Sequence, residues 1–130
     1  MKKIKILLIE DTPEDIGFVT IQLTESFGQD YTLEKSDYFS KALQLLSIKT
    51  YDVIILDLSL PDSYGLETFK TLIKHCNSPI IVYTGLLHEL IKKEMMESGA
   101  HDYLIKGQTS NETLKHSIIQ SIKNYNLNKK

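Results

Sequence analysis

Three acidic residues stand at the ends of apolar segments and could hold a metal ion together. Glu10 and Asp11 directly follow the apolar run 4–9, and Asp57 stands near the end of the run 53–58. Crowded carboxylates repel one another, so they need a cation or one of them must stay protonated. Oxygen ligands favour a hard ion such as Mg²⁺, and a bound ion would attract phosphate. Because a carboxylate can also be an attacking nucleophile, phosphoryl transfer is the chemistry to consider.

The acids can meet only if the segments that precede them are neighbouring strands of one sheet. Five segments have the length and composition of strands, and four of them are continuously apolar. A continuous pattern is typical of parallel strands that are buried on both faces. The segments are Ile4–Ile9, Val53–Leu58, Ile80–Tyr83 and Tyr103–Ile105, with the more alternating Tyr31–Ser36 as an expected edge strand.

Each expected strand is followed by a segment with helical periodicity. The first helix is expected to begin with Thr12 as its cap and Pro13 in its first turn, and to end at Gly28. The apolar rows are Ile16, Val19, Leu23 and Phe27; Phe39, Ala42, Leu43 and Leu46; Leu66, Phe69 and Ile73; Leu87, Ile91 and Met95; and Leu114, Ile118 and Ile122. This alternation predicts an α/β fold with a five-stranded parallel sheet and right-handed crossovers.

The strand order decides where the acids lie. We expect the order 2-1-3-4-5 with helices on both faces, as in flavodoxin-like doubly wound folds. Ligands of such sheets bind beyond the carboxyl ends of the strands, where the strand order reverses. That point lies between the first and third strands, so Glu10, Asp11 and Asp57 are expected to converge there.

The composition is that of one ordinary domain. Its 130 residues carry a formal net charge of -2, and no basic stripe indicates direct binding of nucleic acid. No apolar run of about 20 residues is present, so no contact with a membrane is expected. Cys76 is the single cysteine, which excludes an internal disulfide and fits a reducing, cytoplasmic location. Neither Cys76 nor the histidines have the spacing of a metal site, and Lys129–Lys130 is interpreted as a solvated helix end.

Four segments resemble the motifs of the response-regulator receiver domain of two-component signalling. They are Ile6–Asp11, Val53–Asp62 with Gly65, Pro79–Gly85 and Gly99–Lys106. Each motif is short, but all four stand in order at the expected strand ends. The resemblance covers nearly the whole chain and implies a single receiver domain over residues 1–130.

The resemblance implies that Asp57 is the phosphoacceptor and that the cofactor is Mg²⁺. Asp11, Asp57 and the backbone carbonyl of Ser59 would ligate the ion directly. Glu10 would contribute through a water molecule.

The resemblance also implies a switch on the neighbouring strands. Thr84 would donate a hydrogen bond to the phosphoryl group, and Lys106 would pair with its remaining charge. Tyr103 would be the aromatic residue whose ring turns inward when Thr84 moves. A phosphoryl group carries about two negative charges and three strong acceptors, so these contacts form only after phosphorylation and can bias a two-state loop.

Two positions depart from the family pattern. Gly107 stands where proline usually follows the conserved lysine, often after a cis bond. A cis bond before glycine would cost about 3 kcal/mol, so we expect a trans bond or a rearranged loop. Leu86 is apolar where a polar residue is frequent, and we expect Leu86 and Ser59 to influence how readily water reaches the acyl phosphate.

The expected function is a phosphorylation-controlled switch rather than a metabolic enzyme. Its phosphodonor would be a sensor histidine kinase or a phosphotransfer protein. It would act by binding a protein partner at the face formed by the fourth and fifth helices and the last strand. The last helix runs almost to the C-terminus, so we expect no attached output domain, and either a monomer or a phosphorylation-linked dimer.

Three other functions share parts of this pattern. An aspartate-nucleophile phosphohydrolase would carry a second Asp two residues after the nucleophile, where this chain has Ser59. A receiver-like interaction module without phosphorylation control would not need the intact acidic cluster. A flavin or nucleotide binder would need a Gly-rich loop after the first strand, where 10–13 would repel phosphate unless a metal intervened.

Overall fold

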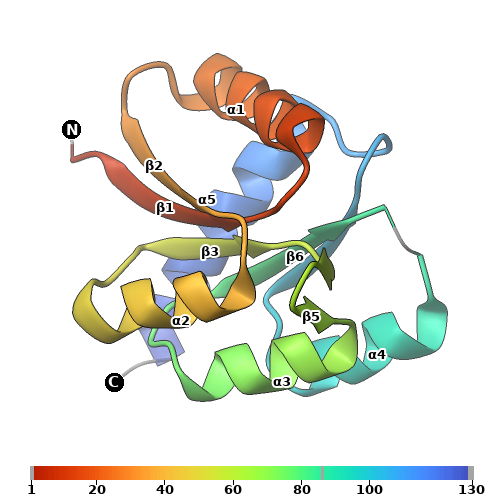
Figure 1. The fold of residues 1–130 in the computed structure, drawn as a ribbon. Helices are drawn as coiled ribbons and strands as arrows, with labels where there is room; N and C mark the ends of the chain where they lie inside the picture. Colours follow the sequence, from red (N-terminus) through yellow and green to blue (C-terminus); the bar gives the residue numbers. More distant parts are fainter. Residues whose placement is uncertain (1, 86, 129–130) are drawn as a thin grey trace.

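The computed structural model describes residues 2–85 and 87–128 and contains the predicted parallel sheet (Figure 1). Its five strands stand in the order β2-β1-β3-β6-β7, which is the predicted order 2-1-3-4-5 when a separate hairpin is left out of the numbering. The strands are β1 (Ile4–Ile9), β2 (Tyr31–Ser36), β3 (Val53–Leu56), β6 (Ile80–Thr84) and β7 (Asp102–Ile105). All neighbouring pairs are parallel, and β2 is an edge strand as expected.

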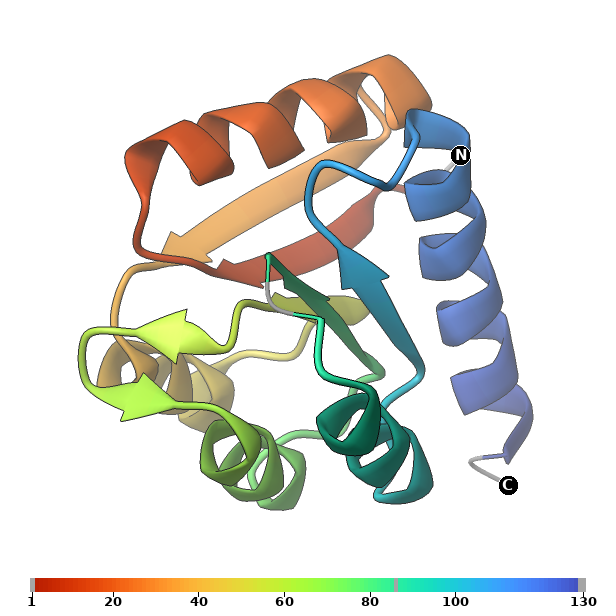
Figure 2. The same cartoon turned by 90° about the vertical axis from the view of Figure 1, so that its right-hand side faces the viewer.

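Five helices cover the two faces of the sheet (Figures 1 and 2). On one face lie α1 (Pro13–Phe27) and α5 (Asn111–Asn128), and on the other lie α2 (Phe39–Ile48), α3 (Leu66–Lys74) and α4 (Glu89–Glu97). The buried apolar residues form two clusters that follow the same division. All four residues of β3 are fully buried, because this central strand lies between both helix layers. Within the described residues, no helix has the length and apolar character needed to cross a membrane.

The segment after β3 differs from the prediction. The expected strand Val53–Leu58 ends at Leu56, and a short antiparallel hairpin follows, formed by β4 (Ser59–Leu60) and β5 (Ser63–Tyr64). The N–H of Gly65 donates to the carbonyl oxygen of Leu58 at 2.8 Å, which closes the hairpin at its base. The loop that follows Asp57 is therefore an ordered element.

Asp62, in the turn of this hairpin, caps helix α2. Its carboxylate accepts hydrogen bonds from the N–H groups of Phe39 at 2.7 Å and Ser40 at 2.9 Å. Tyr38, at the cap position itself, provides no side-chain hydrogen bond. Desolvation of Asp62 opposes its charge, but the N–H groups of Ser40 and Phe39 outweigh this and lower the pKa of the carboxyl. The loop after Asp57 is thereby fastened to α2.

Two helix starts also differ from the prediction. The side chain of Thr12 makes no capping hydrogen bond; instead the Thr12 N–H donates to a carboxylate oxygen of Glu10 at 3.2 Å. Leu87 precedes α4 and is 51% exposed, so it does not belong to the buried row of that helix. Gly28 does end α1, with a φ of 60°. The predictions for Leu86 and Lys129–Lys130 fall outside the described residues.

His101, just before β7, packs its ring edge-on against Tyr125 with centroids 5.7 Å apart. Its Nδ1 atom is buried without a hydrogen-bond partner among the described residues, and burial lowers the pKa of the imidazole. Because the folded state disfavours the charged imidazole, protonation of His101 favours the unfolded state. The free energy of unfolding is therefore unaffected by His101 above its unfolded pKa of about 6.5 and decreases as the pH falls below that value. We predict that His101→Phe, which keeps an aromatic ring, reduces the loss of unfolding free energy between about pH 7 and pH 5.

Urea unfolding at a series of pH values tests this prediction. The exposed His116, on α5, supplies the control, because His116→Phe should leave the pH dependence as it is in the unmodified chain. An equal loss of stability in His101→Phe and the unmodified chain would contradict it.

Candidate functional site

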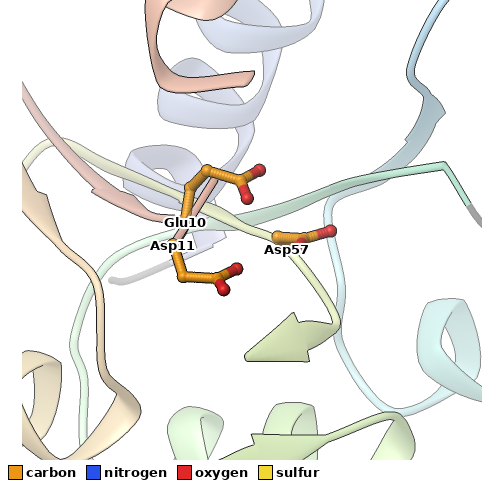
Figure 3. A group of neighbouring side chains, drawn as sticks. All are labelled: Glu10, Asp11 and Asp57. Carbon is orange, nitrogen blue, oxygen red and sulfur yellow. The ribbon is translucent and has the colours of Figure 1, made fainter. Parts of the chain in front are cut away.

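The three predicted acids meet at the carboxyl ends of β1 and β3 (Figure 3). Glu10, Asp11 and Asp57 each offer a carboxylate oxygen, and these oxygens lie within 4.8 Å of one another. The pairing of the two strands brings this about, since Ile9 lies opposite Leu56 and the Asp57 N–H donates to the Ile9 carbonyl oxygen at 3.0 Å. The predicted convergence of the acids is confirmed.

A cleft of about 430 Å³ opens beside the acids. Asp57 lines it and is only 5% exposed, whereas Glu10 is 1% exposed and lies outside the lining. The lining residues are Asp11, Thr12, Asp15, Asp57, Leu58, Ser59, Tyr64, Thr84, Gly85 and Lys106. The cleft thus gathers the predicted phosphoacceptor, two predicted metal-site residues and two predicted contacts of the phosphoryl group.

Lys106, which follows β7, extends its ammonium into the acidic cluster. It forms ion pairs with Glu10, with Asp15 at 2.8 Å and, at a longer 3.4 Å, with Asp57. Desolvation opposes the charge of the ammonium, but the hydrogen bonds to Asp15 and Glu10 outweigh it and raise the pKa of Lys106. Burial raises the pKa of Glu10, and the hydrogen bond from Lys106 counteracts this effect. Lys106 therefore remains protonated and is the cation among the lining residues of the cleft.

Asp15 is a charged residue of the site that the sequence analysis did not identify. It lies in the first turn of α1, where an acid is favourable because of the helix dipole, so its position alone indicates no further role. Asp15 follows Asp11 by four residues, but Asp11 precedes α1, so helical spacing gives no signal that the two lie together. The ion pair with Lys106, which lies 91 positions further on, depends on the tertiary structure.

The predicted switch residues Thr84 and Tyr103 lie on adjacent strands. Thr84 ends β6, is 2% exposed and lines the cleft, and its carbonyl oxygen accepts the Lys106 N–H at 2.8 Å. Tyr103 lies opposite Val82 and is 3% exposed, within the apolar cluster that includes Met95. Its ring is therefore inside the core on the side of α3 and α4. The placement suits the predicted roles, which remain predictions.

Gly107 occupies a conformation that proline cannot adopt. The described residues contain no cis peptide bond, so the expected trans bond before Gly107 is confirmed. The φ of Gly107 is 83°, in the left-handed region that favours glycine, whereas proline is restricted to a φ near −65°. The loop after Lys106 is thus built differently from the usual pattern with proline.

We predict that Gly107→Ala destabilises the fold by about 1–2 kcal/mol, because a side chain is strained at this φ. Gly107→Pro should cost more, since the ring excludes the observed conformation. Urea unfolding measures both losses. Gly17, inside α1 with open space at its Cβ position, is the matched control, because Gly17→Ala should not destabilise a helix. If the Gly107→Pro variant were as stable as the unmodified chain, the prediction that this loop requires a positive φ at residue 107 would be wrong.

The fold and the site together define a class. A doubly wound parallel sheet that gathers acids, a hydroxyl residue and a lysine at the carboxyl ends of its strands is the architecture of a receiver domain. The family model of the response regulator receiver domain matches residues 6–118. The chain belongs to this family and hence to two-component signal transduction.

Individual relatives agree with this assignment. The chain is 34% identical over 103 residues to the response regulator ArlR of Staphylococcus aureus. The matched segment covers 78% of this chain and 45% of that protein. The chain therefore spans about half the length of that relative. Among solved structures, the receiver domain of the Francisella response regulator 1452 has a TM-score of 0.77 and 27% identity, and the match covers 94% of this chain and 98% of that one.

A second structure shows the likeness of the fold. It is the signal receiver domain of a protein described as a Luxo repressor, from Vibrio parahaemolyticus. Its TM-score is 0.84 at 22% identity, with 98% of this chain and 95% of that chain covered. At this identity the likeness concerns the fold alone.

Proposed function

We propose that this receiver domain accepts a phosphoryl group on Asp57 and that the phosphoryl group switches the binding of partner proteins. The observation that supports it is the position of Asp57, the buried one among the acids that line the cleft. Asp11 lies beside it, and the Lys106 ammonium is 3.4 Å away. The phosphodonor would be a sensor histidine kinase or a phosphotransfer protein.

In the proposed transfer, a carboxylate oxygen of Asp57 attacks the phosphorus of the donor phosphohistidine, and the P–N bond breaks. A carboxylate needs no base to activate it, so the task of the surrounding residues is to neutralise charge. Lys106 can supply a charge-assisted hydrogen bond to a phosphoryl oxygen, and the Thr84 hydroxyl can supply another. Both residues line the same cleft as Asp57.

The donor set of the cleft fits magnesium. Four carboxylates gather at the site: Glu10, Asp11 and Asp57 lie close to one another, and Asp15 joins them through its contact with Lys106. Lys106 contacts the other three acids, whereas Asp11 has no hydrogen bond or ion pair with the described residues. Asp11, Asp57 and the backbone carbonyl of Ser59 would hold the ion, and Glu10 would contribute through water. When bound, the ion would supply positive charge for the phosphoryl oxygens.

Magnesium is therefore expected to stabilise the folded chain. A ligand that binds only the folded state adds about 2.7 kcal/mol at a concentration 100 times its Kd. We predict that MgCl2 raises the melting temperature at constant ionic strength and that Asp11→Asn greatly reduces this rise. Asp30→Asn, which changes an exposed acid outside the cleft, is the control and should keep the full rise. Equal rises in Asp11→Asn and Asp30→Asn would contradict the assignment of Asp11.

Incubation with magnesium and acetyl phosphate tests the function directly. Intact mass spectrometry should show one added phosphoryl group for each chain. The same reaction distinguishes the enzyme alternative, because an aspartate-nucleophile phosphohydrolase would release phosphate from many added phosphomonoesters over multiple turnovers. A receiver assists only its own phosphorylation and hydrolysis. A chain that gains no mass would support the interaction module that is not controlled by phosphorylation.

The proposed output surface is the face formed by α4, β7 and α5. Large apolar side chains are exposed on α4, including Leu90 (72%) and Met96 (39%), which is the composition that a docked protein can cover. Residues 1–130 would form a single receiver domain in the cytoplasm, and its effect would come from binding a partner protein at this surface. It would be a monomer or a dimer whose formation is linked to phosphorylation.

A further inference from the structure

The ammonium of Lys106 is shared unequally among three acids at the cleft. It forms ion pairs with Glu10 and with Asp15 at 2.8 Å, while its distance to Asp57 is 3.4 Å. The shorter contacts are therefore to Glu10, which follows β1, and to Asp15 in α1, and the contact with the proposed phosphoacceptor is the longest of the three. A phosphoryl group on Asp57 would have to draw the ammonium from one of them.

The two acids differ in how easily they could release Lys106. The side chain of Glu10 is 1% exposed, so losing its cation would leave a buried carboxylate uncompensated. The side chain of Asp15 is 41% exposed, so water can replace the ammonium there at little cost. Asp15 also lies in the first turn of α1, where the helix dipole favours a negative charge. Asp15 is thus the partner that Lys106 can leave.

We propose that Asp15 is a positioning residue that keeps the Lys106 ammonium from closer contact with Asp57 and competes with the phosphoryl group for it. This inference rests on the proposed function of Asp57. Asp15 would weaken the hold of the cleft on a phosphoryl group, because each phosphorylation must first break the Asp15–Lys106 contact. Removing the charge of Asp15 releases Lys106 and strengthens that hold.

Binding of fluoroberyllate, which mimics a phosphoryl group on a carboxylate, tests the proposal. The affinity is measured by ¹⁹F NMR at saturating magnesium, so that changes in metal affinity do not enter. Asp15→Asn should tighten binding by about two- to fivefold, the range expected for a partly exposed ion pair. The control is Glu14→Gln, which removes the same charge from the neighbouring, exposed residue of α1 and should leave the affinity near that of the unmodified chain.

A second pair of variants separates competition from simple charge repulsion. In a Lys106→Met background, Asp15→Asn should have little further effect, because the contact that it releases is already absent. A similar tightening with and without Lys106 would show repulsion by Asp15 and overturn the proposal. An unchanged or weaker affinity of Asp15→Asn would also overturn it. If the unmodified chain bound no fluoroberyllate, the proposed function of Asp57 would fail first, and this inference with it.

Discussion

Asp57→Asn will abolish the uptake of a phosphoryl group from acetyl phosphate in the presence of magnesium. The amide has nearly the shape of the carboxylate, which matters because Asp57 is only 5% exposed. It lacks the negative oxygen that would attack phosphorus, and it is a poorer ligand for magnesium. The fold should persist, because the substitution relieves the repulsion among the carboxylates that lie within 4.8 Å of one another. Intact mass of the treated and untreated protein measures the loss.

The comparison with Asp30→Asn makes this result specific. Asp30 is exposed and lies outside the cleft, so its variant should be labelled as fully as the unmodified chain. Circular dichroism of both variants shows whether the fold is retained. Labelling that persisted in Asp57→Asn would place the phosphoacceptor elsewhere and remove the basis of the proposed function.

Lys106→Ala should still allow Asp57 to take up a phosphoryl group, but the conformational response of α4 and β7 to that group should be reduced. The nucleophile and the acids of the metal site stay in place, so acetyl phosphate can still react with Asp57. The ammonium that would join the phosphoryl group to β7 is removed. We also expect a loss of stability of about 3 kcal/mol without magnesium, because Glu10 is left buried without its cation.

Amide NMR spectra with and without fluoroberyllate, at saturating magnesium, measure this conformational response. In the unmodified chain, amide signals of α4 and β7 should shift on addition of fluoroberyllate. In Lys106→Ala these shifts should shrink, although the mass increase with acetyl phosphate remains. Lys35→Ala, an exposed lysine on β2, should behave like the unmodified chain in both measurements. Full shifts in α4 and β7 without Lys106 would show that the signal takes another route.

Much of the architecture could be predicted from local patterns in the chain. Continuous apolar runs identified the buried strands, and helical spacing between them implied crossovers and hence a parallel sheet. The position of Glu10, Asp11 and Asp57 after these runs then implied a common edge, and their oxygens do lie within 4.8 Å of one another. These inferences succeed because strand direction and burial depend on short-range periodicity.

The contacts that refine the site could not be predicted in this way. Asp62 caps α2 from the hairpin after β3, and Asp15 binds Lys106 across 91 positions of sequence. Each depends on how far one element is rotated and shifted against another, which is set by the packing of the whole core. The left-handed φ of Gly107 likewise results from the path between β7 and α5. The sequence alone therefore determined which acids meet. Only the tertiary structure decided which of these acids pair with Lys106, because an ion pair between distant segments requires ångström-level placement that no local pattern encodes.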